Sequence, residues 1–278
     1  PCALVGDAMR LGQVLVNLGN NAVKFTERGE VCVRIAMIER GEHDVRLRFS
    51  LIDTGVGMSA DERERLFTAF TQADASTSRR YGGTGLGLTI SRELVRLLGG
   101  AIEVQSERGR GSVFSFDTRL GLRSDVDASS AALPRRLPSV PAARVLVVDD
   151  NATAAEAIVA VSAQLGWDAR AVADGWDALR AAARGTHAGE PFDLAIVDAR
   201  MPGMDGVETM QRLTETHGPR LAIVLSCHPY ERDALMKRLA GLRLAPAGVL
   251  AKPVTLQRLA DVGAVALGDG HADESRPP

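Results

Sequence analysis

Five polar side chains in the second half of the chain each follow a run of strand-forming apolar residues: Asp149, Asp150, Asp198, Ser226 and Lys252. Neighbouring carboxylates can hold Mg²⁺, which prefers a few such ligands and keeps several waters. An aspartate can attack phosphorus to form an acyl phosphate, and a lysine offers the phosphoryl group a compact positive charge. The hydroxyl of Ser226 can reorient towards that group. Polar residues at the surfacing ends of buried strands would explain any one of the five, but poorly explain the whole set.

A second set of candidate residues lies in the first 90 positions. Asn17 and Asn21 are four apart, hence on one face of a predicted helix, and Lys24 follows three residues later. Side-chain amide oxygens are suitable ligands for a Mg²⁺ ion that also holds phosphates. For a lone pair of asparagines, a solvated polar face of the helix is the alternative interpretation.

Two glycine-containing segments complete this second set. In Asp53-Thr54-Gly55-Val56-Gly57-Met58 the carboxylate can accept a hydrogen bond from an amino group such as the adenine N6. The run Gly82-Gly83-Thr84-Gly85-Leu86-Gly87-Leu88 opens a helix, where free backbone N–H groups form an anion site. The run is neither a Walker loop nor a Rossmann fingerprint, because no Gly-Lys-Ser/Thr ends it and no βαβ unit surrounds it.

Hydrophobic periodicity predicts the elements that position both sets. In the first part of the chain it predicts helices at 7–26, 60–70 and 89–98 and strands at 31–39, 45–53, 101–106 and 112–118. In the second part it predicts five strands that alternate with helices, at 145–148, 169–172, 194–197, 222–225 and 248–251. Such alternation indicates a parallel, doubly wound sheet, in which the carboxyl ends of the strands converge where ligands bind.

The composition of the chain changes between these two parts. Its 278 residues suffice for two domains, which we place at 1–120 and 144–268. Residues 121–143 are rich in Asp, Ser, Ala and Pro without periodicity, which predicts a linker. Residues 269–278 are polar and are predicted to form a flexible tail.

The order of the first-half motifs is more specific than any single motif. Asn17 to Thr26, Asp53 to Met58, Leu66 to Phe70 and Gly82 to Leu88 resemble, in this order, the N, G1, F and G2 boxes of histidine-kinase catalytic domains. The resemblance covers residues 1 to about 120 and implies the Bergerat fold, a two-layer α/β sandwich that binds ATP and Mg²⁺.

By position, this resemblance implies a role for each candidate residue. Asn21 corresponds to the Mg²⁺ ligand, Asn17 and Lys24 lie near the phosphates, and Asp53 reads the adenine. The remaining cofactor contacts fall on the adenine loop, the lid and the phosphate-side loop: Gly55, Gly57, Phe67, Phe70, Arg80, Gly83, Thr84, Gly85, Leu86 and Gly87.

One rival class shares the implied fold, namely the ATP-hydrolysing gyrase and chaperone relatives. Those proteins carry a glutamate general base four residues before the Mg²⁺-binding asparagine. Asn17 stands at that position here, and its amide cannot take a proton from water. Phosphoryl transfer to another protein group is therefore favoured over hydrolysis.

The second-half residues resemble response-regulator receiver domains over their whole length. The resemblance rests on Asp149-Asp150, on the segment from Asp198 to Gly206 and on Lys252-Pro253. It implies a flavodoxin-like (βα)5 fold with strand order 2-1-3-4-5, phosphorylation of Asp198, and a further Mg²⁺ ligand in the backbone carbonyl of Arg200. Receivers often carry Tyr or Phe three residues before the lysine, and Val249 departs from that pattern.

Together the two resemblances are to the C-terminal part of a hybrid two-component histidine kinase. They imply phosphoryl transfer from ATP to a histidine, and then to Asp198. Of the five histidines only His43, followed by Asp44 and Arg46, has even a superficial likeness to an acceptor motif, and it lies in a predicted turn. The histidine-bearing dimerisation domain is therefore expected upstream of Pro1 or in trans, and the first strand of the fold is expected to be truncated.

The implied partners of the chain are this histidine-bearing domain and a histidine phosphotransfer protein or downstream response regulator. Because dimerisation would reside in the histidine-bearing domain, we expect a monomer. The alternative functions are a regulatory module that binds ATP and accepts phosphate without kinase activity, and an ATP-driven conformational machine.

Composition excludes several other classes of protein. A formal net charge of −2 and 4% aromatic residues give no reason to expect a nucleic-acid partner. No apolar run approaches the roughly 18 residues that span a bilayer, so no membrane contact is expected from these residues, although a parent protein can be membrane-anchored. Three scattered cysteines fit no disulfide framework, which favours a reducing cytoplasm.

Overall fold

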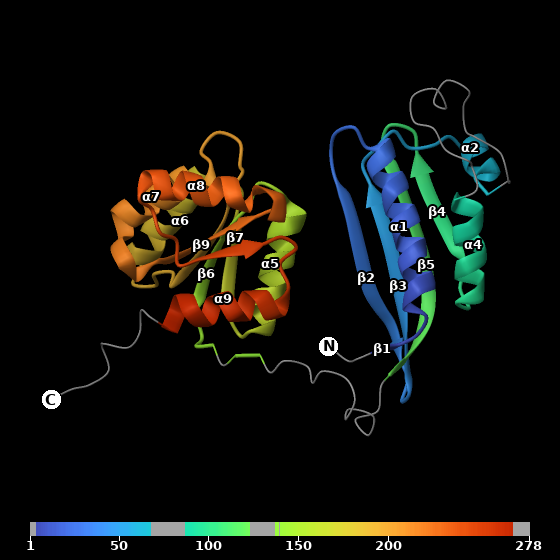
Figure 1. Cartoon of the computed structure of the whole chain (residues 1–278), viewed down its shortest axis with the longest axis horizontal. Helices are drawn as coiled ribbons and strands as arrows, with labels where there is room; N and C mark the ends of the chain where they lie inside the picture. The colour runs from blue at the N-terminus through green and yellow to red at the C-terminus, as the bar shows by residue number, and fades with distance from the viewer. Residues whose placement is uncertain (1–3, 68–86, 123–136, 139, 269–278) are drawn as a thin grey trace. The chain divides into compact units, whose positions relative to one another are not determined.

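The computed structural model describes residues 4–67, 87–122, 137–138 and 140–268. The chain divides into two compact units, Pro1–Ala132 and Leu133–Pro278 (Figure 1). No helix in the described ranges is long and apolar enough to cross a membrane. Of the cysteines in those ranges, Cys32 and Cys227 are both free thiols.

The first unit packs helices on one face of an antiparallel sheet (Figure 1). Its described helices are α1 (Ala8–Phe25), α2 (Ala60–Arg65) and α4 (Gly87–Leu97). Asp7 begins α1 as predicted, since its Oδ1 accepts the N–H of Arg10 at 2.9 Å. Apolar residues at helical spacing bury one stripe of α1, namely Val14, Leu18 and Ala22.

The sheet of the first unit is antiparallel, with the strand order β1-β5-β3-β2 and with β4 also paired to β5. The strands are β1 (Leu4–Val5), β2 (Val31–Arg40), β3 (Asp44–Asp53), β4 (Ile102–Glu107) and β5 (Gly111–Leu122). Phe49 of β3 and Phe116 of β5 stack with their ring centroids 5.3 Å apart. They face α1 and Val95 of α4, which gives the expected two-layer α/β sandwich.

Two boundaries in this unit differ from the prediction by more than two residues. The helix predicted at 60–70 ends at Arg65, and residues 68–70 lie outside the described part of the chain. The last strand runs to Leu122, because its far end pairs with both β3 and β1. The first strand, β1, has two described residues, which pair with Gly121 and Leu122 of β5.

The second unit is a parallel five-stranded sheet with the order β10-β9-β8-β6-β7. Its strands are β6 (Arg144–Val148), β7 (Asp168–Val172), β8 (Leu194–Asp198), β9 (Ala222–Cys227) and β10 (Gly248–Ala251). In chain order this is 2-1-3-4-5, so the predicted flavodoxin-like topology is confirmed.

Helices cover both faces of this second sheet. They are α5 (Ala152–Gln164), α6 (Gly175–His187), α7 (Gly206–His217), α8 (Arg232–Leu242) and α9 (Leu256–Gly268), with short 3₁₀ turns at Gly218–Arg220 and Pro229–Glu231. Helices α5 and α9 pack around Trp167 on one face, and α6, α7 and α8 pack on the other. The indole N–H of Trp167 donates to the carbonyl of Pro141 at 2.9 Å, which fastens the chain entering β6.

Candidate functional site

Three carboxylates of the second unit converge at the carboxyl ends of two adjacent parallel strands. Asp149 and Asp150 follow β6, and Asp198 ends β8; oxygen atoms of all three lie within 4.8 Å of one another. The strand order reverses between β6 and β8, and ligands bind at such a switch point in open α/β sheets. Asp149 and Asp198 are buried, while Asp150 is exposed, so the cluster has one open side.

Lys252, just past the end of β10, reaches across the sheet to this cluster. Its Nζ lies 2.9 Å from Asp149 Oδ2 and 3.0 Å from Asp198 Oδ1. The other oxygen of Asp149 accepts the N–H of Asn151 at 3.0 Å, which fixes the carboxylate plane. One cation among three carboxylates leaves an excess of negative charge, which suits a divalent cation. The sequence prediction that these four residues come together is borne out geometrically.

Burial governs the protonation of this cluster. Burial raises the pKa of Asp198 above its ordinary value, and the neighbouring Asp149 and Asp150 add to this, although Lys252 acts in the opposite direction. Burial alone would lower the pKa of Lys252, but its hydrogen bonds to Asp149 and Asp198 outweigh burial and raise that pKa. Lys252 is therefore fully charged at neutral pH.

Ser226 lies directly beside Asp198 in the register of β8 and β9. Its hydroxyl is buried and has no hydrogen-bond partner, which is uncommon for a buried polar group in a folded protein. Val249, which departs from the aromatic pattern, packs against the core beneath.

Gly206 brings the first turn of α7 against the end of β8. A Cβ at this position would lie 2.1 Å from the carbonyl oxygen of Asp198, so only glycine fits. Asp205 caps the same helix by accepting the N–H groups of Val207 and Glu208, each at 3.0 Å. The Asp205-Gly206 pair thus sets the path of the loop that leaves Asp198.

In the first unit, α1 contacts the helix α4 and the loop that follows β3, and both bear candidate residues. The side-chain amide of Asn17 donates to Ser91 Oγ of α4 at 2.7 Å. A Cβ on Gly87 would lie 2.6 Å from Asn17 Oδ1, so the start of α4 approaches Asn17 closely. At the end of α1, the carbonyl of Phe25 accepts the N–H of Val56 at 3.2 Å.

The loop that follows β3 is built around a buried carboxylate. Asp53 is 6% exposed, and its Oδ1 accepts the N–H of Gly55 at 2.9 Å. Gly57 adopts φ +60°, and a Cβ there would lie 1.9 Å from the carbonyl oxygen of Glu107. Gly111 approaches Asp53 equally closely from β5, with a Cβ position 1.9 Å from the Asp53 carbonyl oxygen. These contacts leave no room for larger side chains, so the position of Asp53 is set by backbone packing.

Of the other residues predicted to bind the nucleotide, some lie within the described part of the chain and others lie outside it. Asn21 lies one turn beyond Asn17 on α1, and the ammonium of Lys24 lies 5.1 Å from the centroid of the Phe25 ring. The guanidinium of Arg92 on α4 lies 5.4 Å from the centroid of the Phe67 ring, which places Phe67, a predicted lid residue, beside α4. Six predicted residues lie outside the described part of the chain: Phe70, Arg80, Gly83, Thr84, Gly85 and Leu86.

Two family models match the two units separately. Residues 6–122 match the family described as "Histidine kinase-, DNA gyrase B-, and HSP90-like ATPase", and residues 145–262 match "Response regulator receiver domain". The sensory/regulatory protein RpfC of Xanthomonas campestris is 35% identical over 290 aligned residues, which cover 94% of this chain and 39% of RpfC. The autoinducer 2 sensor kinase/phosphatase LuxQ of Vibrio cholerae is 35% identical over 258 residues, which cover 91% of this chain and 29% of LuxQ.

A solved structure also matches both units. Full-length ShkA in complex with AMPPNP has a TM-score of 0.68 and 30% sequence identity, and the match covers all of this chain and 50% of that protein. This chain joins the two domains of a hybrid sensor histidine kinase. It spans half or less of the length of these relatives.

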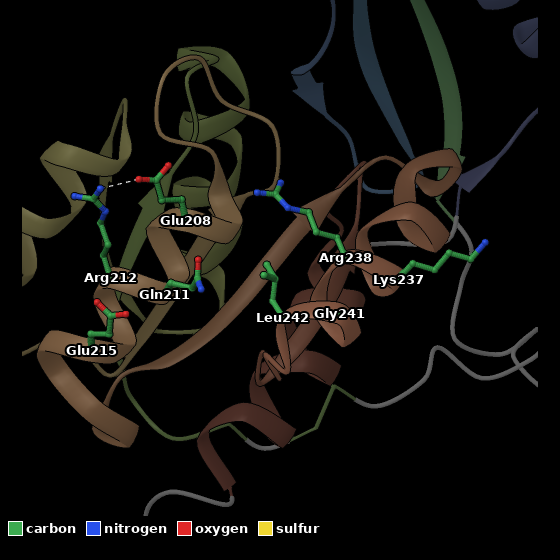
Figure 2. A pocket seen from close by; sticks show the side chains of 8 residues that line it. All are labelled: Glu208, Gln211, Arg212, Glu215, Lys237, Arg238, Gly241 and Leu242. Carbon is green, nitrogen blue, oxygen red and sulfur yellow. Dashed lines mark hydrogen bonds and ion pairs between the residues drawn. The ribbon is translucent and has the colours of Figure 1, made fainter.

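The receiver domain of this hybrid kinase also has a groove away from the acidic cluster. The groove, of about 840 Å³, lies between α7 and α8, as Figure 2 shows, and contains none of the predicted site residues. Glu208 and Arg212 form an ion pair of 2.7 Å within it, while Arg238 pairs with the capping Asp205 at 2.8 Å. Its charged residues largely neutralise one another, so the groove does not compete with the acidic cluster as the site of chemistry.

Two residues of the kinase fragment that sequence reasoning missed lie next to predicted ones. Ser91, the partner of Asn17, is 1% exposed, and a serine inside an amphipathic helix gives no signal of its function. Glu231, after β9, forms an ion pair of 2.6 Å with Arg200. No motif distinguishes Glu231, because its role depends on how two loops meet in space.

Proposed function

We propose that this chain is the ATP-binding and phospho-accepting part of a phosphorelay. In this proposal the ATPase domain binds Mg-ATP and phosphorylates a histidine on a dimerisation domain, and Asp198 of the receiver domain then accepts the phosphoryl group. A histidine phosphotransfer protein or a downstream response regulator would exchange the group with Asp198.

In the first step, the residues of the ATPase domain bind and orient the nucleotide. The buried carboxylate of Asp53 would accept a hydrogen bond from the adenine amino group, and Asn21 would supply an amide oxygen to Mg²⁺, with Asn17 and Lys24 near the phosphates. Bound Mg²⁺ neutralises charge on the phosphates. Asn17 donates to Ser91 and cannot act as a base, which supports transfer to a protein histidine over hydrolysis.

In the second step, a carboxylate oxygen of Asp198 attacks the phosphorus of a phosphohistidine. An O–P bond forms as the P–N bond breaks, and the electron pair returns to the imidazole ring. Asp149, Asp150, Asp198 and the Arg200 carbonyl would hold Mg²⁺, which would offset charge on the phosphoryl oxygens. Lys252 keeps its positive charge and contacts the same group, and the Ser226 hydroxyl turns towards it.

One observation carries the proposal. Three carboxylates lie within 4.8 Å of one another, and a single lysine contacts the two buried ones at 2.9 and 3.0 Å. A purely structural ion pair needs only one carboxylate for each lysine. The excess negative charge beside a raised pKa at Asp198 is more typical of a functional site.

The test of phospho-acceptance is labelling of the full chain by radioactive acetyl phosphate with Mg²⁺. We expect an acid-stable, base-labile label that Asp198→Asn abolishes and that EDTA prevents. The matched control is Asp205→Asn, which keeps a good helix cap seven residues away and should label normally. Equal labelling of the Asp198 variant and the parent chain would contradict the proposal.

The nucleotide half of the proposal is tested by calorimetric titration with Mg-ATP. Asn21→Ala should weaken binding at least tenfold, equivalent to about 1.4 kcal/mol. Asn20→Ala, on an exposed part of the same helix, is the control and should bind as the parent does. Binding without transfer to a histidine-bearing domain added in trans would favour the regulatory-module alternative. The expected monomer can be checked by sedimentation over a range of concentrations.

A further inference from the structure

Arg200, two residues beyond Asp198, is held by a residue from a different loop. Its Nη1 lies 2.6 Å from Glu231 Oε1, and Glu231 Oε2 accepts the backbone N–H of His228 at 3.2 Å. The Glu231 side chain is only 15% exposed, whereas that of Arg200 is 76% exposed. One carboxylate thus binds both the loop after β8 and the loop after β9.

These two loops begin at neighbouring residues of the phosphoryl site. Asp198 ends β8, and its register partner Ser226 is the residue before the end of β9, so the two loops start after Asp198 and after Cys227. The buried Ser226 hydroxyl has no partner in this arrangement. The Arg200–Glu231 pair connects the loop after Asp198 to the loop after β9, so a movement of either loop on phosphorylation would have to break this pair.

A phosphoryl group on Asp198 would compete with Glu231 for the guanidinium of Arg200. A bound phosphoryl group carries up to about two negative charges, and a carboxylate carries one. Guanidinium groups also match phosphate oxygens well in geometry. The mostly exposed side chain of Arg200 has room to turn, because among the described residues Glu231 alone accepts a hydrogen bond from it.

We propose that Arg200 and Glu231 are positioning residues of the phosphoryl site: Glu231 holds Arg200 and residues 228–231 in the unphosphorylated arrangement, and Arg200 exchanges Glu231 for the phosphoryl group. The inference rests on the proposed phospho-acceptance by Asp198. It assigns a role to the side chain of Arg200, separate from the Mg²⁺ role of its backbone carbonyl.

The test uses the full chain with Mg²⁺ and beryllofluoride, a mimic of the phosphoryl group, and measures the affinity by calorimetry. Glu231→Gln keeps an acceptor for His228 but weakens the hold on Arg200, so beryllofluoride should bind about fivefold more tightly. Arg200→Ala removes both the restraint and the new partner, so binding should be about fivefold weaker. Glu208→Gln breaks the similar pair with Arg212 (Figure 2) and should leave the affinity unchanged.

Hydrogen exchange supplies a second readout in the same samples. In the parent chain, beryllofluoride should speed amide exchange in residues 228–231, and Arg200→Ala should show fast exchange there before any ligand is added. If the parent binds and both variants keep its affinity, the pair is an ordinary surface ion pair and the inference is wrong. Equal tightening in both variants would mean that Arg200 gains no phosphoryl contact, which also overturns it. A parent chain that binds no beryllofluoride would refute the proposed phospho-acceptance itself.

Discussion

The two sites of this chain are built from opposite materials. The receiver site gathers charges from the ends of parallel strands, with a lysine ammonium 2.9 and 3.0 Å from two buried carboxylates. The described part of the ATPase site contains mostly neutral amides and glycines, with one buried carboxylate and Lys24, and α1 links it to the start of α4 and to the Asp53 loop. In the receiver site the carboxylates therefore repel one another, whereas the ATPase site depends on close backbone packing.

The ATPase domain also has a strong charge cluster, but on the opposite face of its sheet. Phe116 faces the helices, so the next residue, Asp117, faces away from them. Asp117 accepts hydrogen bonds from Arg48 at 2.6 Å and from Arg46 at 2.8 Å. There two cations surround one acid, whereas three acids surround one cation in the receiver. The balance of charge, more than the number of ion pairs, decides whether a cluster stabilises its domain.

The largest effect should come from removing the single cation of the receiver cluster. Lys252→Met keeps the aliphatic chain but leaves two buried carboxylates unpaired, which should lower the free energy of unfolding of this domain by about 3 kcal/mol. Urea unfolding of the full chain in EDTA measures this, because both tryptophans, Trp167 and Trp176, lie in the receiver domain. Their fluorescence reports the receiver domain directly.

The control for that substitution is Lys237→Met. Lys237 lies on the exposed face of α8 in the groove of Figure 2, and its loss should change the unfolding free energy by less than about 0.5 kcal/mol. An equally small change for Lys252→Met would show that the carboxylates of the receiver cluster repel one another only weakly. The contrast between the two sites would then fail.

The sequence predicts the receiver site well for a simple geometric reason. In a parallel sheet the carboxyl ends of all strands lie at one edge, so Asp149, Asp198 and Lys252 had to meet once the strands were located. The strand order itself followed from the family resemblance. For the ATPase domain, the same resemblance identified the two-layer sandwich, and helical spacing placed Asn17 and Asn21 on one face of α1.

The sequence could not predict contacts that depend on where separate loops meet. The Asn17–Ser91 bond joins residues 74 positions apart, and neither residue type requires the other. The Arg200–Glu231 pair depends on the turn of the chain after β9. Strand ends were also uncertain, because the extension of β5 to Leu122 depends on its pairing with β1 and β3 and not on local propensity.

The next largest effect tests whether packing alone holds the ATPase site. Ser91→Ala removes the acceptor of the Asn17 amide in a buried position, which should destabilise the ATPase domain by about 1–2 kcal/mol. Hydrogen exchange of α1 and α4 in the full chain measures this. A double-mutant cycle with Asn17→Ala should give a coupling energy of at least about 0.5 kcal/mol. Strictly additive effects would mean that the bond does not connect the two helices energetically.

Acidification should stabilise the receiver domain when no Mg²⁺ is present. The folded-state pKa of Asp198 is raised by burial, so its ionised form is disfavoured in the folded state. The contribution of Asp198 to the free energy of unfolding is therefore present below its unfolded-state pKa and is lost as the pH rises through its folded-state pKa. Lowering the pH from 7 towards 4 should therefore raise the urea midpoint of tryptophan fluorescence.

Asp198→Asn is the matched variant for this pH response. It removes one of the three carboxylates, so at pH 7 the receiver domain should be more stable by about 1 kcal/mol, with a flatter pH profile. Saturating Mg²⁺ should narrow the difference between the variant and the parent, because the ion offsets the same repulsion. A variant that is less stable than the parent at pH 7 would show that the Lys252 ion pair outweighs the repulsion.

The smallest effect should be found at Asp117, where the pH dependence has the opposite sign. The pKa of Asp117 is lowered mainly by the hydrogen bonds and the positive charge of Arg48, and also by those of Arg46. The burial of Asp117 acts in the opposite direction but is outweighed. The stability from this group is therefore present above the ordinary aspartate value of 3.8 and is lost as the pH falls through the folded-state pKa. Asp117→Asn should cost the ATPase domain about 1 kcal/mol at pH 7 and less at the acid end. Hydrogen exchange in β3 and β5 can follow this in the same chain in which tryptophan fluorescence follows the receiver domain. We infer that burial raises the pKa of Asp198 and that the neighbouring arginines lower the pKa of Asp117. If acid changed the free energy of unfolding of both domains in the same direction, this inference would be wrong.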